Sequence, residues 1–118
     1  MQLNWTTVTI AVGQSLSTPL DLQYGQIVRI WGPPVWTAAS LTFQGSFSGN
    51  AWDDLVDQAG AEHSIPMTGA VNGSERAFAV PREWTLGMKF VLLRSGTGAV
   101  PVPQVAERAL QIAYRPFA

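Results

Sequence analysis

The sequence contains no cysteine, a single histidine and few charged residues. Without cysteine, the chain forms no disulfide, offers no thiol nucleophile and lacks the usual zinc ligand sets. Only 13% of its 118 residues are charged, which is about half of the usual share near 25%. So few charges are typical of a protein that other subunits partly cover, and also of a β-rich domain whose exposed faces carry Thr, Ser, Gln and Asn.

The charges that are present nearly cancel. The formal net charge is −1, and the lysines and arginines form no run, so the basic surface of a nucleic-acid-binding protein is not expected. No stretch approaches the ~18 consecutive apolar residues of a membrane span. The first ten residues, MQLNWTTVTI, have no basic start and no long apolar core. We therefore expect no signal peptide, no membrane partner and synthesis in the cytoplasm.

Motifs of the common enzyme classes are also missing. The chain has no Gly-x-Ser-x-Gly elbow, no GxGxxG and no Walker motif. Asp53, Asp54 and Asp57 offer oxygens to calcium, but neighbouring strand residues point to opposite faces and the EF-hand spacing is absent. We expect these aspartates to be solvated or to pair with arginines of a neighbouring subunit. His63 is expected in an exposed loop, and the chain is predicted to be no enzyme, with no cofactor and no metal site.

Alternation of apolar and polar residues dominates the sequence. At residues 7–12 it places Val8, Ile10 and Val12 on one face and threonines on the other, which predicts a strand with one buried and one wet face. Further strands are predicted at 26–31, 76–80 and 88–94, with shorter ones at 20–22 and around Ile65, Met67 and Val71. One helical turn is expected at 81–85.

The strictest alternation follows a tryptophan in WTAASLTFQGSF. Leu41, Phe43 and Phe47 share one face and are predicted core residues, whereas Thr42 lies on the opposite face, which we expect to be wet. The Ser-Gly-Asn sequence that follows is a turn, because Gly and Asn tolerate positive φ. Residues 52–56 are then expected to return antiparallel, which completes a hairpin.

The last apolar segment, 108–115, contains good helix formers. Leu110, Ile112 and Tyr114 nevertheless alternate with other residues, and a proline follows, which favours a strand over a helix. About eight short strands separated by Gly and Pro turns predict a single all-β domain spanning residues 1–118. The expected fold is an antiparallel two-sheet β-sandwich of the jelly-roll type.

Five tryptophans are many for a chain of this size. A sandwich core together with an oligomer contact would absorb such large rings, and we favour this interpretation. Stacking on sugar rings, as in carbohydrate-binding modules, is the alternative. The candidate interface residues are Trp5, Trp31, Trp36, Trp84 and Arg94. Trp84 is also expected to cap the core, as is Trp52, and Trp36 and Trp52 are candidates for either a contact or a cap.

Several segments, in order along nearly the whole chain, carry a resemblance to a known family. They are QSLS at 14–17, LDL at 20–22, WTAASLTFQGS at 36–46, DLVDQAGAE at 54–62 and RSGT at 94–97 with its continuation to 110. These segments resemble the small β-sandwich virion proteins that are encoded among the head and tail genes of tailed bacteriophages.

The resemblance implies a non-catalytic, structural role on the virion. It implies a capsid decoration or cement protein that binds the assembled lattice of the major capsid protein and stabilises it. The expected location is the capsid surface, after synthesis in the cytoplasm of the bacterial host, and a homo-oligomer is expected, with a trimer favoured by icosahedral symmetry. Because related sandwiches occur in tails and fibres, the alternative is a tail- or fibre-associated or carbohydrate-binding module for host attachment.

Overall fold

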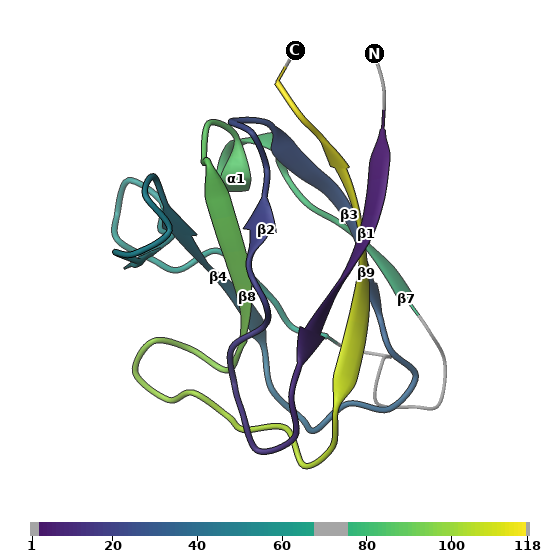
Figure 1. Ribbon diagram of the computed structural model, residues 1–118. Coiled ribbons are helices and arrows are strands. Elements are labelled where there is room, and N and C mark those ends of the chain that lie inside the picture. Colours follow the sequence, from purple (N-terminus) through teal and green to yellow (C-terminus); the bar gives the residue numbers. More distant parts are fainter. Residues whose placement is uncertain (1–2, 68–75, 118) are drawn as a thin grey trace.

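Antiparallel strands dominate the computed structural model, which describes residues 3–67 and 76–117 (Figure 1). The strands are β1 (Asn4–Ile10), β2 (Leu20–Asp21), β3 (Gln26–Gly32), β4 (Leu41–Ser46), β5 (Asp53–Asp54), β6 (Ser64–Ile65), β7 (Arg76–Ala79), β8 (Phe90–Ser95) and β9 (Arg108–Arg115). A single helical turn, α1 (Arg82–Thr85), precedes β8. Within the described ranges, no helix is long and apolar enough to cross a membrane.

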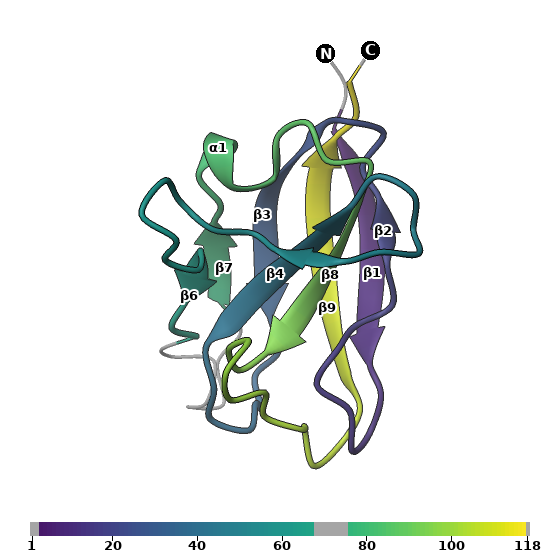
Figure 2. The same cartoon turned by 90° about the vertical axis from the view of Figure 1, so that its left-hand side faces the viewer.

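The strands form two sheets that face each other (Figures 1 and 2). One sheet has the order β1-β9-β3-β7, and the other has the order β2-β8-β4-β5, with β6 also paired to β4. The pairs are nested along the chain, since β1 pairs with β9, β2 with β8, β3 with β7 and β4 with β5. A ribbon of nested antiparallel pairs that wraps into two sheets is a jelly roll. The predicted all-β, jelly-roll-like sandwich is confirmed.

The core lies between the two sheets and follows the predicted period of two. Its fully buried side chains include Ile10, Leu22, Ile27, Ile30, Leu41, Phe43, Met67, Val91, Leu93, Leu110 and Ile112. On β9, Leu110 and Ile112 point inward and Tyr114 is half-buried, in a strand with the predicted bounds 108–115. The predicted helical turn is present as α1. Val71, expected in a short strand, lies outside the described residues.

Three predictions about burial are wrong because the period of two does not continue past a strand end and does not show what covers the second face. Val12 is 64% exposed, since β1 ends at Ile10 and a turn closed by the Gln14 N–H on the Ala11 carbonyl follows. Phe47 is 71% exposed because β4 ends at Ser46.

Thr42 was expected in solvent but has no exposed surface. Its hydroxyl donates a 2.7 Å hydrogen bond to the Gly96 carbonyl and accepts one of 3.0 Å from Nε of Arg94. The outer face of β4 at this point is therefore covered by the neighbouring strand β8 and the loop that follows it. Both faces of the strand are buried here, so alternation alone could not locate the solvent.

Candidate functional site

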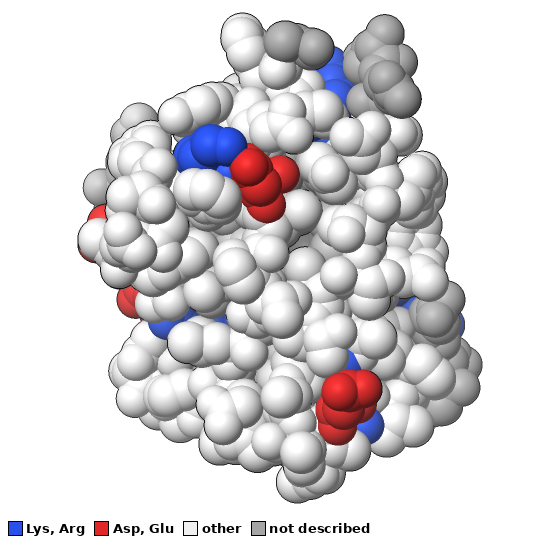
Figure 3. Space-filling view, in the orientation of Figure 1, with Lys and Arg blue, Asp and Glu red and all other residues white. Residues whose placement is uncertain are grey.

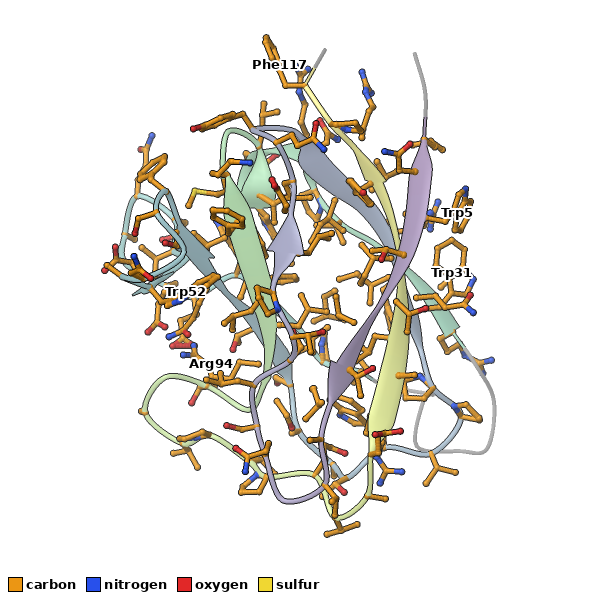
Figure 4. The ribbon with its side chains drawn as sticks, viewed as in Figure 1. Trp5, Trp31, Trp52, Arg94 and Phe117 are labelled. Carbon is orange, nitrogen blue, oxygen red and sulfur yellow. The ribbon has the colours of Figure 1, made fainter. Side chains whose placement is uncertain are left out.

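Two tryptophans meet on the outer face of the four-stranded sheet (Figure 4). The ring centroids of Trp5 on β1 and Trp31 on β3 lie 4.9 Å apart, with the ring planes tilted by 45°. Strand β9 runs between these strands, and its Ala113 pairs with Trp5 while its Gln111 pairs with Trp31. Ala113 is 1% exposed although it points outward, because its small side chain leaves the space above β9 to the two rings. Trp5 itself is 60% exposed.

The sheet around this pair carries short or uncharged side chains, with one exception. The outward residues beside the rings are Thr7, Arg29, Ala77, Ala79, Ala109 and Gln111. An open hollow of about 400 Å³ adjoins Trp31 and is bordered by the two prolines at 33–34 and by Val35, which is 61% exposed. We call this surface, from Trp5 through Trp31 to Val35, the tryptophan face. Trp31 is half-buried, so the pair presents mainly the ring of Trp5. An aromatic pair on a rigid sheet can anchor a protein interface or stack on a sugar ring.

Two of the other predicted interface tryptophans face the interior. Trp36 is 4% exposed, and its indole N–H donates a 3.0 Å hydrogen bond to the Ala39 carbonyl. It is a core residue, so its assignment to an interface is wrong. Trp84 is half-buried, with its ring edge-on to Phe43 at 5.8 Å and stacked on His63 at 4.9 Å. Trp84 thus caps the core, and it shields His63, which was expected to be exposed.

Arg94 was also predicted to lie at an interface, and the structure buries it. Its side chain is 5% exposed, and Nη1 lies 2.7 Å from Oδ1 of Asp54 while Nη2 lies 3.4 Å from Oε1 of Glu62. The hydrogen bond from Arg94, aided by one from Gln44, holds the pKa of Asp54 below its usual range. Asp54 therefore pairs with an arginine of its own chain rather than of a neighbouring subunit, and the guanidinium joins β8 to β4 and β5.

A second buried polar group joins the loops below the sheets. Gln104 has no exposed surface, and its amide N–H groups donate to the Ser95 hydroxyl at 2.7 Å and to the Thr37 carbonyl at 3.1 Å. Its carbonyl oxygen accepts from Nε of Arg108 at 3.0 Å. Within the described ranges, no buried side-chain nitrogen or oxygen lacks a partner. Both polar groups therefore hold the fold together.

The remaining charges are sparse on the molecular surface. Figure 3 shows a face that is largely uncharged, with only small isolated patches of either sign. One ion pair joins Nζ of Lys89 to Oδ2 of Asp21 at 2.7 Å, and this hydrogen bond lowers the pKa of Asp21. In the part of the chain that the structure describes, no three His, Cys, Asp or Glu side chains gather as metal ligands would. The few charged residues of the sequence therefore leave most of the face shown in Figure 3 without charge.

Comparisons with known proteins assign no family to this fold. No family model and no curated protein matches the sequence. The crystal structure of a mitogen from Yersinia pseudotuberculosis is similar to this chain with a TM-score of 0.37 and 9% identity, over 98% of this chain and 86% of the mitogen chain. A likeness this distant carries no functional argument, and the assignment of the fold rests on the strand order described above.

Sequence reasoning missed one hollow at the end of the molecule where the chain ends lie. This hollow, which we call the terminal groove, has a volume of about 1150 Å³ and is lined mainly by Tyr24, Arg82, Leu86, Arg115 and Phe117. These residues come from segments far apart in the sequence, so no local spacing predicted them.

Proposed function

We propose that this chain is a non-enzymatic structural protein that docks on a larger protein assembly through the tryptophan face. The observation that carries the proposal is the contact between Trp5 and Trp31 on a sheet face whose outward residues beside the rings are uncharged except for Arg29. A contiguous exposed apolar patch on a protein marks an interaction site, and the core of a protein interface is depleted in charge and enriched in aromatic residues.

One specific assembly is supported by the resemblance to small virion proteins, which lies in segments 14–17, 36–46, 54–62 and 94–110. That assembly is the capsid of a tailed bacteriophage, with the major capsid protein as partner and a homo-oligomer, favoured as a trimer, as the binding unit. Such a protein acts through contact area. By binding the assembled lattice but not the free capsid subunit, it stabilises the lattice by mass action.

The tryptophan face has the chemistry that this role needs. A stable interface buries about 1,200–2,000 Å² in total, and a few central aromatic residues supply most of its binding energy. Trp5 is 60% exposed, so a partner that covers the exposed part of this side chain, about 100–150 Å², would gain about 2–4 kcal/mol of binding free energy. Both rings stand on regular strands, so little conformational entropy would be lost on binding.

Particles that lack this chain provide the test, with the purified protein added back. We expect the wild-type chain to bind in tens to hundreds of copies per particle and to raise the temperature at which the particles release their DNA. A Trp5→Ser, Trp31→Ser double variant should bind at least about 100-fold more weakly, since two anchors are lost. Val12→Ser is the matched control, because Val12 is equally exposed at a different place.

Two results would contradict the proposal. If the double variant binds as tightly as the wild type, the tryptophan face is not the binding surface. If each particle carries six or twelve copies, the protein lies at the tail or at vertices instead of over the lattice.

The same rings favour a second candidate function, carbohydrate binding for host attachment. The hollow beside Trp31 includes Thr7, Glu107 and Gln111, whose polar groups could bond the hydroxyls of a stacked sugar. A glycan array probed with the wild type and with the Trp31→Ser variant separates the two candidates. Binding to a defined glycan that is lost in the variant would support this function, and an array without any signal would count against it.

A further inference from the structure

The turn between β4 and β5 presents an exposed aromatic ring beside a carboxylate. Phe47 is 71% exposed, and it borders the same small hollow as Asp53. Asp53 is exposed and takes part in no salt bridge among the described residues. We call these two residues and the turn that carries them the hairpin tip.

The hairpin tip is held in one conformation by its own hydrogen bonds. Oγ of Ser46 accepts from the N–H groups of Ser48 at 3.2 Å and Gly49 at 2.8 Å. Oγ of Ser48 in turn accepts from the N–H group of Asn50 at 3.1 Å. An aromatic side chain on such a preorganised turn loses little entropy when it enters a partner's pocket.

The terminal groove has the opposite charge and similarly apolar walls. Its lining contains two arginines, Arg82 and Arg115, and no acidic residue. Neither arginine forms a salt bridge or side-chain hydrogen bond within the described ranges. Leu86 and Phe117, which are 43% and 72% exposed, supply apolar surface.

The backbone beside the groove is tightly constrained. Gln23 and Tyr24 have φ values of 51° and 64°, and the Gly25 N–H bonds to the Leu22 carbonyl at 2.8 Å. This is a type I′ turn in which neither central residue is glycine, a conformation that the surrounding structure has to hold in place. The turn presents Tyr24, which is 49% exposed, to the groove. The Phe117 N–H donates to the Gln23 carbonyl at 3.3 Å and fixes the C-terminal segment beside it.

We propose that the hairpin tip of one copy of this chain docks in the terminal groove of a second copy. Phe47 would lie against Leu86 and Phe117, and the carboxylate of Asp53 would meet the guanidinium groups of Arg82 and Arg115. Charge-assisted hydrogen bonds between arginine and carboxylate are among the stronger polar contacts, and an aromatic anchor in a pocket is the usual centre of an interface. This contact would specify how the homo-oligomer of the proposed function forms. It rests on that proposed function for the expectation that the oligomer is closed.

The position of the two surfaces determines the symmetry of this contact. Figure 4 shows Trp52, next to the hairpin tip, at one side of the molecule and Phe117, in the terminal groove, at its upper end. Each copy therefore uses two different surfaces, so a single contact leaves one tip and one groove free, and repeating the contact builds a closed ring or an open chain. A ring of three copies would suit a three-fold position on a capsid.

A mixing experiment tests this contact directly. Sedimentation velocity should show concentration-dependent association of the wild type, weakened at least about tenfold by Phe47→Ser and by the double variant Arg82→Gln, Arg115→Gln. The first variant keeps an intact groove and the second an intact tip, so an equimolar mixture should form a heterodimer that grows no further. Arg76→Gln, which removes an exposed arginine outside the groove, should associate as the wild type does.

Three outcomes would overturn the proposal: a monomeric wild type at about millimolar concentration, Phe47→Ser associating like the wild type, or no heterodimer in the mixture. The changed side chains are largely at the surface, so equal melting temperatures should show that every variant is folded. Particle binding measured separately distinguishes this result from failure of the proposed function, because monomers could still bind the capsid through Trp5 and Trp31.

Discussion

Replacement of Thr42 by valine tests the way in which this sandwich covers the outer face of β4. The substitution keeps the shape of the side chain and removes its hydroxyl, which donates to the Gly96 carbonyl at 2.7 Å and accepts from Nε of Arg94 at 3.0 Å. Both partners are buried, so water cannot replace the lost hydrogen bonds without structural change. A buried polar group left without a partner costs about 1–3 kcal/mol, and more when the group is charged.

The two lost hydrogen bonds together should lower the free energy of unfolding by about 3 kcal/mol. A domain of this size has only about 5–15 kcal/mol in total. At about 4 °C per kcal/mol for a chain of this length, the melting temperature should fall by about 12 °C. Thr7→Val is the matched control, because Thr7 is exposed on the outer face of β1, and it should change stability by about 0.5 kcal/mol or less.

Urea denaturation of the three proteins would measure these differences. Equal midpoints for Thr42→Val and Thr7→Val would refute the reasoning, since they would mean that the outer face of β4 is open to water, as simple alternation suggested. A large loss for both variants would instead mean that the outer face of β1 is covered too.

The other predictions concern the core, the ion pair between Arg94 and Asp54, and one glycine. Phe43→Ala removes a ring that is 1% exposed and should cost about 3–5 kcal/mol by urea denaturation; a loss below about 1 kcal/mol would place Phe43 outside the core. The pKa of Asp54 is lowered in the folded protein by Arg94, so its contribution is present above the ordinary value of 3.8 and disappears as the pH falls through the lowered value. The stability gap to Asp54→Asn should accordingly be about 1 kcal/mol or less at pH 7, because the carboxylate is partly exposed, and should close below about pH 4; a gap that widens in acid would contradict the ion pair. Gly25→Ala places a Cβ against the Arg115 carbonyl, and thermal melting should show a loss of about 1–3 kcal/mol. An unchanged melting temperature would mean that the turn before β3 can move away from the end of β9 without cost.

The fold could be predicted because its strands carry local signals. In β9, Leu110 and Ile112 recur every second residue and point to the same side, so the bounds 108–115 and the buried face followed directly from the sequence. Gly32 and the prolines after it likewise mark where β3 ends. These signals are short-range, and they fail where the strand stops, as at Phe47.

The roles of the aromatic and charged residues could not be predicted in the same way. Trp36 and Trp5 look alike in the sequence, yet one is 4% exposed and the other 60% exposed. Arg94 sits in a strand with apolar residues on both faces, and its partners Asp54 and Glu62 lie on separate segments some 30–40 residues earlier in the chain. Only the pairing of β8 with β4, and of β4 with β5, brings these groups together.

The nested order of strands also explains why the tryptophan face exists at all. Trp5 and Trp31 belong to strands that are not hydrogen-bonded to each other, and they meet only because β9 returns from the end of the chain and lies between β1 and β3. The wrapped ribbon that buries the core thus also brings together an aromatic pair from two strands of the N-terminal part of the chain, with the C-terminal strand β9 between them. Figure 4 places this pair on the opposite side from Trp52, so a ring held by hairpin tips and terminal grooves would leave one tryptophan face per copy available. Linking several such faces raises their effective concentration at a repeating partner surface, and weak individual contacts would then suffice for lasting attachment.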